Sequence, residues 1–501
     1  MNRNRHSSLP LFKKTKDAVF TKRKTAKEKI QKSGTQERPM DEIRELFRDY
    51  RDRIETVYQY FITVIFAIYL IFPPVNFIRR QSGGDLYFSL WRDYLPIAAA
   101  VFVLFYLFMR LFVWERRTFA DLKQRILGNP AWIFLSLLAV WMIISAFVTG
   151  FDHETVIGSK KSHTGLLYSL IYILVFTMAL SMKRKKHIRF LIGLFLSVGC
   201  IVSFLCIYDY YFNSGSERTF VTDNRIFYNS NHLSYYLLVV TVCACLLFLL
   251  SKKKSVLIFS ILVFAAGTVA LFLGNALGCH LALALSLVFS TIVLLLTGKF
   301  RWKRFLAVIL VLCLVILTLL FVPNFVDHKT TDNLFLKNLK EMLRCIDAIG
   351  DFEDAPNSLG SGRMLLWRTA IDATLDKPIF GNGLSRMRML LLSATHYSNN
   401  TVHNELLEFS SNQGIPALLF YLAFVFSDFI RGAKNRKKLT AMNTAALCTA
   451  FAYIVSSCFG VTMFYTAPYL YICLALGYYS PHDGLAASDG SAVPPAQQSR
   501  E

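Results

Sequence analysis

Acidic residues and charges within apolar segments are both scarce in this sequence. The 501 residues include 33 Asp and Glu against 55 Lys and Arg, and the long apolar runs are nearly free of either kind except near their ends. Transporters usually carry ionisable residues or interrupted helices at mid-membrane depth, so this scarcity disfavours a transporter. A phosphate-binding P-loop and internal repeats are also absent, which argues against an energy-coupled pump.

Motifs for metal binding and for disulfide frameworks are missing as well. The sequence has no CxxC pair and no HExxH helix, so neither a metal site nor a cofactor is indicated. Nine of the ten cysteines lie in apolar stretches, where Cys behaves as a small hydrophobe, and only Cys345 lies in the largest polar loop. Alternating segments of about ten residues, which a membrane β-barrel requires, are absent too.

Long apolar stretches fill most of the chain instead, and hydrophobic residues make up 54% of it. A helix that crosses the ~30 Å hydrocarbon core needs about 20 mostly apolar residues. Twelve stretches meet this requirement, at 56–77, 94–114, 131–150, 165–182, 189–212, 232–250, 255–273, 276–297, 304–323, 404–430, 439–459 and 462–480. The tenth begins with polar turns. The sequence therefore predicts an all-α polytopic membrane protein with about twelve transmembrane helices.

Basic loops predict how these helices are oriented. Lys and Arg cluster in five short loops, at 115–125, 183–189, 252–254, 299–304 and 431–438. Counting helices places all five on the same side as residues 1–54. Because cytoplasmic loops are enriched in Lys and Arg, we expect both termini in the cytoplasm and the large loop 325–402 outside.

The predicted organisation has five parts. Residues 1–54 hold sixteen Lys and Arg against eight Asp and Glu, so we expect a largely disordered basic tail attracted to anionic membrane lipids. Nucleic acid is not expected as a partner, and no cleavable signal peptide is predicted, because the first apolar run starts late and is long. Spans one to nine occupy 55–324, the external loop 325–402 and the last three spans 403–480, and a disordered tail follows at 481–501.

The large external loop contains a predicted amphipathic helix at 362–376. Met364, Trp367, Ile371 and Leu375 follow helical spacing, with Ser361 as a candidate N-cap and Pro378 as a stop. Arg363 in its first turn opposes the helix dipole, which indicates an anionic partner. The following "PIFGNG" supplies Gly381 and Gly383, which predict a tight turn with exposed N–H groups.

Basic and titratable side chains gather on the predicted external face. Arg225 precedes the sixth span, where a plain interfacial anchor is the alternative interpretation. His403 begins "HNELLE", in which Glu405 and Glu408 could bind an acceptor or face water, while His280 is expected to be a packed polar group. Arginine suits phosphate oxygens and histidine can act as a general base, so the pattern favours displacement of a lipid-borne pyrophosphate by a hydroxyl.

Three segments resemble the O-antigen ligase and polymerase family of membrane glycosyltransferases: "RIFYNSNHLSYYL", the pair "GRMLLWRTA" and "KPIFGNGL", and "HNELLEFSSNQGIPALLFYL". The twelve-span layout is also similar, and the resemblance covers roughly residues 130–480. It implies metal-independent, inverting transfer of a glycan from undecaprenyl pyrophosphate to a hydroxyl of a lipid, glycan or protein acceptor, outside the bacterial cytoplasmic membrane.

The resemblance also implies roles for individual residues. His403 would be the catalytic base, Arg225 and Arg363 would hold the pyrophosphate, and Asn404 and Arg386 would help to bind substrate. The chain departs from the family at "GNALGC" (274–279), where many members have a Ser-Arg pair; Lys160, Lys161 or Arg386 could compensate. A ligase and a repeat-unit polymerase are not distinguished by these residues, and a lipid-linked glycan flippase stays open as an alternative from another class.

Overall fold

The computed structural model describes eleven longer segments and three pairs of residues: 51–81, 94–114, 119–127, 129–158, 164–212, 226–227, 229–321, 333–348, 356–357, 359–360, 362–384, 386–395, 401–460 and 464–478. The chain divides into two compact units, Met1–Thr56 with Phe108–Arg117 and Val57–Leu107 with Thr118–Glu501. The described residues of the first unit are helical. The packing and the sites described below concern the second unit.

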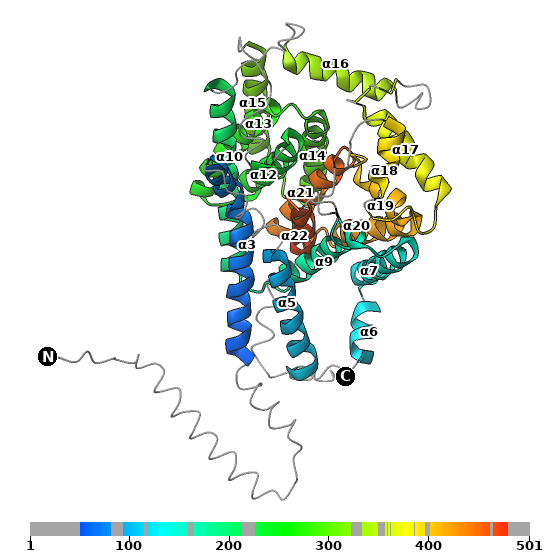
Figure 1. Ribbon diagram of the computed structural model, residues 1–501. Coiled ribbons are helices and arrows are strands. Elements are labelled where there is room, and N and C mark those ends of the chain that lie inside the picture. The colour runs from blue at the N-terminus through cyan, green and yellow to red at the C-terminus, as the bar shows by residue number, and fades with distance from the viewer. Residues whose placement is uncertain are drawn as a thin grey trace, which may run out of the picture. The chain divides into compact units, whose positions relative to one another are not determined.

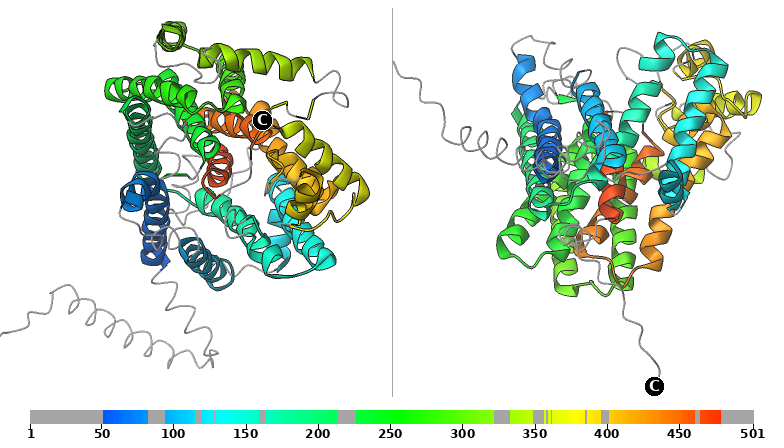
Figure 2. Two further views of the ribbon diagram at one scale, coloured as in Figure 1. Left: turned by 45° about the horizontal axis from the view of Figure 1, so that its top comes forward. Right: turned by 90° about the horizontal axis from the view of Figure 1, so that it is seen from below.

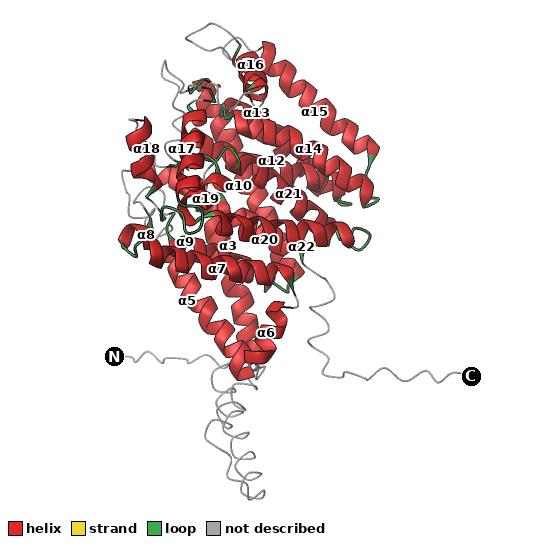
Figure 3. Ribbon diagram, turned by 90° about the vertical axis from the view of Figure 1, so that its right-hand side faces the viewer, coloured by secondary structure: helices red, strands yellow, loops and turns green. Residues whose placement is uncertain are grey.

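Helices are the only regular elements in the described residues, as Figure 3 shows by colour. Their order along the chain (Figure 1) is α3 (Arg51–Gln81), α5 (Leu95–Phe108), the π-helix η2 (Met109–Trp114), α6 (Phe119–Leu127), α7 (Pro130–Thr149), α8 (His153–Ile157), α9 (Leu166–Leu180), α10 (Lys185–Phe212), α12 (Ser230–Leu250), α13 (Lys254–Leu273), α14 (Leu277–Leu296), α15 (Trp302–Phe321), α16 (Leu334–Asp347), α17 (Arg363–Asp376), α18 (Met387–Thr395), α19 (Glu405–Gln413), α20 (Ile415–Lys434), α21 (Ala441–Ser457) and α22 (Ala467–Gly477). The all-α prediction is confirmed for these residues.

Eight helices within the described ranges are long and apolar enough to cross a membrane: α3, α7, α10, α12, α13, α14, α15 and α20. Four shorter apolar helices coincide with the remaining predicted stretches, at Leu95–Leu111, Leu166–Leu180, Ala441–Ser457 and Ala467–Gly477. A multi-pass membrane protein is therefore confirmed. The count of twelve spans stays a prediction, as does the external position of the large loop.

The predicted tenth span, 404–430, is two helices rather than one. Gly414 has a φ of 86° and ends α19, with its N–H donating to the carbonyl of Ser410 at 2.9 Å. Pro416 then occupies the first turn of α20, where the missing N–H costs nothing. Only α20 has the length and apolarity of a span. The polar turns that carry His403, Asn404 and Glu405 therefore precede the span instead of forming its start.

Helix α12 lies at the centre of the helical packing. Of its most apolar window 83% is buried, against 17% for α15. It packs against α10, α13, α14 and α21, which surround it in the views of Figures 1 and 2. A helix that is apolar on all sides is expected inside a bundle, and α12 fits this expectation.

The helix predicted at 362–376 is confirmed as α17, with two corrections. Gly362, at a φ of 83°, is the N-cap in place of Ser361. The face that packs inward is also rotated from the predicted stripe: Leu366, Ala370 and Ala373 form a core with residues of α18 and of the segment before α19, whereas Leu375 is 68% exposed. The neighbours that bury this face are remote in sequence, so its own periodicity could not reveal them.

Candidate functional site

His403 has an uncommon backbone conformation for a residue with a side chain. Its φ is 56°, in the left-handed region, which His, Asn and Asp tolerate better than most residues. Val402 before it is fully buried in the core shared with α17, and Asn404 after it caps α19. Both flanks are therefore fixed, and the strained backbone between them holds the imidazole in one place.

Asn404 acts as the N-cap of α19. Its side-chain oxygen accepts hydrogen bonds from the N–H groups of Leu406 at 3.0 Å and Leu407 at 3.2 Å. Glu408, one turn later, accepts from the N–H of Val402 at 3.3 Å. The capping role of Asn404 explains its position before the helix, while its contact with substrate stays a prediction.

Glu405 is buried, with 1% of its surface exposed, so the expectation that it would face water or bind an acceptor is wrong. Its two carboxylate oxygens accept hydrogen bonds from the hydroxyl groups of Tyr421 on α20 (2.9 Å) and Tyr453 on α21 (3.1 Å). A buried carboxylate needs such partners to offset its loss of hydration. Glu405 thus ties the first turn of α19 to two apolar helices.

The segment "KPIFGNG" (377–383) lies directly against the corner between α19 and α20. The N–H groups of Asn382 and Gly383 donate to the carbonyls of Ser411 (2.9 Å) and Asn412 (2.8 Å). A Cβ on Gly381 would come within 2.5 Å of the backbone of Asn412, and one on Gly414 within 1.9 Å of the Ile379 carbonyl oxygen. The predicted turn is present, with Gly381 at a φ of 70° and Gly383 at 100°, but the expectation that its N–H groups are exposed is wrong, because they are already bonded. The glycines permit two backbones to touch.

Helix α7 supports the same corner from the other side, and lies beside α20 (Figure 3). The indole N–H of Trp141 donates to the carbonyl of Gln413 at 2.9 Å, and the hydroxyl of Ser145 donates to the carbonyl of Phe380 at 2.7 Å. The rings of Trp141 and Phe380 stack with centroids 5.3 Å apart. These contacts fix the end of α19, whose start carries His403.

Arg363 and His403 are within electrostatic range of each other. Burial, the largest cause, together with the positive charge of Arg363 and then the interaction with His232, lowers the pKa of His403 to about 4. Arg363 also interacts electrostatically with Tyr235 on α12 and Cys279 on α14. The guanidinium at the start of α17 is therefore close enough to these residues of two apolar helices, and to the imidazole, to interact with them electrostatically.

His232 was not among the predicted site residues, although it stands in a segment that carries the family resemblance. It lies in the first turn of α12, which Asn229 caps. Its Nδ1 is 3.3 Å from the carbonyl oxygen of Phe227, and because a carbonyl only accepts, Nδ1 must carry the proton in this contact. Nε2 is then left with a lone pair. Arg225, which was predicted from the same segment, lies outside the described residues.

Aromatic side chains lie beside this group of charges. Trp367, one turn along α17 from Arg363, has its ring centroid 6.2 Å from that of Phe459. The hydroxyl of Tyr235 donates to the carbonyl of Phe459 at 2.6 Å. The indole N–H of Trp367 is buried without a hydrogen-bond partner among the described residues. A free donor of this kind is available to a ligand at the start of α17.

Where the structure describes the chain, Arg386 is bound to the loop that follows α7 and not to the group around His403. Its guanidinium forms an ion pair with Asp152 at 3.5 Å and lies against Gly150, in the loop that follows α7. Hydrogen bonds from Thr155, and more weakly Arg386, lower the pKa of the Asp152 carboxyl. Among the described residues these contacts hold Arg386 at the loop after α7 and do not bring it to His403, so its part in substrate binding stays a prediction. Lys160, Lys161 and His396 lie outside the described residues.

His280 packs as expected: its Nε2 is 3.2 Å from the carbonyl oxygen of Leu271, and its ring lies 4.6 Å from that of Phe272. Within the described part of the chain, no three His, Cys, Asp or Glu side chains gather as metal ligands would. The chemistry that the described residues offer is that of a guanidinium, two imidazoles and aromatic donors.

Fold and site together define a multi-pass, all-helical membrane protein whose titratable groups stand where helices begin. Residues 262–422 match the O-antigen ligase family, which confirms the resemblance predicted from the sequence. A search of curated proteins finds no match to the chain. This match implies a membrane glycosyltransferase of the O-antigen ligase and polymerase type. The matched segment contains both Arg363 and His403, whereas Arg225 and His232 precede it.

Proposed function

We propose that this protein transfers a glycan from undecaprenyl pyrophosphate to an acceptor hydroxyl on the external face of the bacterial cytoplasmic membrane. The observation that carries the proposal is the electrostatic proximity of Arg363 and His403, each at the start of a helix and both within the segment that matches the O-antigen ligase family. A cation for a pyrophosphate and a base for a hydroxyl are the two groups that such a displacement requires.

His403 is the general base in this proposal. With a pKa of about 4, its imidazole is neutral near pH 7 and can accept a proton, but it is a weak base in the free enzyme. The bound pyrophosphate would offset the charge of Arg363, which is one cause of the low pKa. The pKa of His403 then rises towards its usual value near 6.5, so that binding of the donor strengthens the base.

Arg363 is the group that holds the donor. It stands at the first position of α17, which no side chain caps and where the helix dipole also favours an anion. The acceptor oxygen attacks the anomeric carbon as the bond from that carbon to the pyrophosphate oxygen breaks, and the hydroxyl proton passes to His403. The leaving undecaprenyl pyrophosphate takes the bonding electrons and needs no proton while guanidinium groups stabilise its charge. A single displacement of this kind inverts the anomeric carbon and uses no metal.

Arg225 and Arg386 are further candidates for binding the pyrophosphate or glycan, and Trp367 offers an indole N–H and a ring face to a sugar. A ligase and a repeat-unit polymerase would share this chemistry and differ only in the acceptor. The family match favours either over a flippase, since a transporter needs no base.

The test is the substitution His403→Asn, because Asn tolerates a φ of 56° and cannot act as a base near neutral pH. We expect turnover to fall at least ~100-fold in a transfer assay with purified protein and lipid-linked glycan, while donor binding stays near normal. His153→Asn, an exposed histidine at the start of α8, is the matched control. Wild-type turnover in His403→Asn would refute the proposed base, and loss of activity in chelator with recovery in Mg²⁺ would refute metal independence.

A further inference from the structure

A second site lies at the opposite end of α12. A cavity with about 1620 Å³ of space between atoms, part of it open to the surroundings, lies between α3, α9, α10, α12, α21 and α22. Its walls are apolar, and no acidic side chain is among the described residues that line it. The polar members of the lining are few: Lys185, Arg189, Ser251, Thr440, Thr449 and Tyr469.

The cavity has a polar mouth and an apolar interior. Lys185 and Arg189 belong to the first turns of α10, and Ser251 and Thr440 flank the ends of α12 and α21. From Lys185 the lining continues along α10 to Phe195, a distance of ~15 Å at 1.5 Å per residue. This is about half of the ~30 Å hydrocarbon core. The cavity therefore has the depth of one leaflet.

Positive charge is concentrated at the mouth. The side chains of Lys185 and Arg189 are exposed there. Arg301 and Arg304 approach the same place, since both donate to the carbonyl of Ser251, just past the end of α12. A ligand that fits has a negative head at the mouth and apolar chains in the interior.

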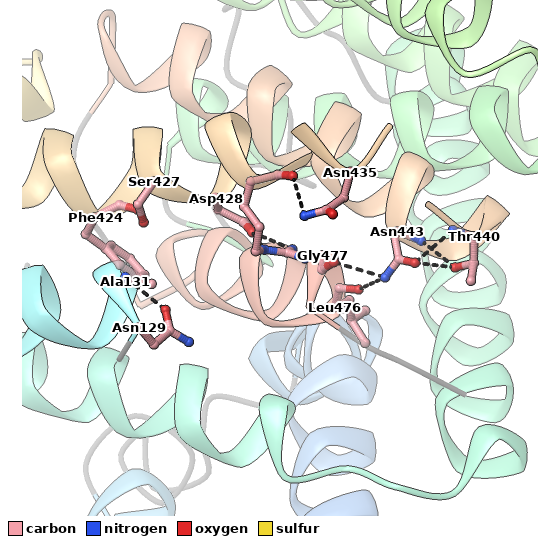
Figure 4. A network of polar contacts seen from close by, with 11 residues as sticks. Asn129, Ala131, Phe424, Ser427, Asp428, Asn435, Thr440, Asn443, Leu476 and Gly477 are labelled. Carbon is pink, nitrogen blue, oxygen red and sulfur yellow. Dashed lines mark hydrogen bonds and ion pairs between the residues drawn. The ribbon is translucent and has the colours of Figure 1, made fainter. Parts of the chain in front are cut away.

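The wall made by α21 and α22 is fixed at the mouth by side chain to backbone hydrogen bonds, as the close view in Figure 4 shows. Asn443 forms a capping box with Thr440 and donates its amide to the carbonyls of Leu476 (2.8 Å) and Gly477 (3.0 Å). The start of α21 is thereby tied to the end of α22. The mouth is accordingly built by the helices themselves and does not depend on a loop.

We propose that this cavity binds the acyl chains of one anionic phospholipid, with the lipid phosphate between Lys185 and Arg189. Basic loops predict that this end of the bundle faces the cytoplasm, so the lipid comes from the cytoplasmic leaflet. Every lining residue lies outside residues 262–422, so the site is separate from the segment that matches the O-antigen ligase family. It also lies at the other end of α12 from His232, and so is distinct from the proposed donor site.

The experiment measures phospholipid binding to the full-length protein in detergent by native mass spectrometry, with phosphatidylglycerol as the probe and zwitterionic phosphatidylethanolamine as the comparison. We expect one phosphatidylglycerol to bind per chain in preference to phosphatidylethanolamine. The double substitution Lys185→Gln with Arg189→Gln should weaken its binding about 30-fold, the effect of two basic groups near an anionic head. Ala446→Phe, which fills the buried interior, should abolish it.

The matched control is Lys186→Gln with Lys253→Gln, which removes two exposed charges from the same end without touching the lining. It should bind phosphatidylglycerol as the wild type does. Equal loss in the control and the double variant would overturn the proposal, because attraction would then be general to the basic end. Three other results would also overturn the proposal. The first is equal binding of phosphatidylethanolamine and phosphatidylglycerol, and the second is recovery of a polyprenyl lipid from the cavity. The third is unchanged phosphatidylglycerol binding both in Ala446→Phe and in the Lys185→Gln, Arg189→Gln double variant.

Discussion

The two ends of α12 belong to two sites built in different ways. At the end that begins with Ser230, the carboxylate oxygens of Glu405 and the side-chain oxygen of Asn404 accept hydrogen bonds, and His403 is held in a strained backbone conformation. At the end that finishes with Leu250, the cavity walls are apolar and charges occur only at the mouth. Catalysis requires groups placed within fractions of an ångström, whereas a lipid chain requires only apolar volume of sufficient length.

This contrast implies that single substitutions should have unequal effects at the two ends. Removal of one hydrogen-bonded or charged group at the first end leaves buried partners unsatisfied or a substrate unheld. A change of one apolar residue in the cavity wall mainly alters its volume. The following predictions sharpen or break the comparison, beginning with the largest expected effect on catalysis.

Arg363→Ala should weaken donor binding and lower turnover together, by about 10- to 150-fold, the usual value of a charge-assisted hydrogen bond. The reason is that the guanidinium contacts the pyrophosphate both before and during the reaction. Donor binding and kcat are measured on the purified variant. Arg368→Ala, on the same helix with its guanidinium bonded to Asn357, is the control and should keep both parameters near wild type. Equal effects in the two variants would show that Arg363 has no special role.

Glu405→Ala should lower the free energy of unfolding by about 2–6 kcal/mol, because it leaves the buried hydroxyls of Tyr421 and Tyr453 without their acceptor. Thermal unfolding of the detergent-solubilised variants provides the measurement. Glu408→Ala is the companion in the same helix, and its side chain is half-buried and accepts the longer, 3.3 Å hydrogen bond from the N–H of Val402, so its effect should be smaller. If Glu408→Ala proves the more harmful of the two, the site is not anchored through Glu405.

The acid limb of the pH profile should differ between the free enzyme and the donor complex. Protonation of His403 abolishes the base, so kcat/KM should fall as the pH decreases through about 4, the pKa of the free enzyme. The acid limb of the kcat profile should lie at higher pH than that of kcat/KM, because the bound pyrophosphate offsets the positive charge of Arg363 and so raises the pKa of His403. Arg363→Gln removes that cation and should raise the kcat/KM limb towards pH 6.5. Coincident limbs in the wild type would refute coupling between donor and base.

The spans and helix α17 could be predicted from the sequence because their signals are local. Apolar length identifies a span, and helical spacing identified 362–376 to within one residue. The split at Gly414 was missed because polar turns merge smoothly into the apolar run. The burial of Glu405 could not be predicted, since its partners Tyr421 and Tyr453 carry no pattern that distinguishes them from other aromatic residues in spans.

The candidate site was predictable only in part, for the same reason. His403 and Arg363 stand in segments that resemble the family, and the structure brings them within electrostatic range. His232 joins them across about 170 residues of chain, a proximity that no short-range pattern encodes. The N–H groups of Asn382 and Gly383 read as free in sequence, because their acceptors follow about 30 residues later.

The contacts of α7 with the corner at Gln413 also determine when, during synthesis of the chain, this corner can form. Trp141 bonds to a carbonyl 272 residues later, and Ser145 to one 235 residues later. The ribosome therefore delivers α7 to the membrane long before its partners exist, and one side of that helix must wait against lipid or a chaperone. A chain released before Gln413 cannot complete the corner, so truncated products lack the support beneath His403 however many helices they have already inserted.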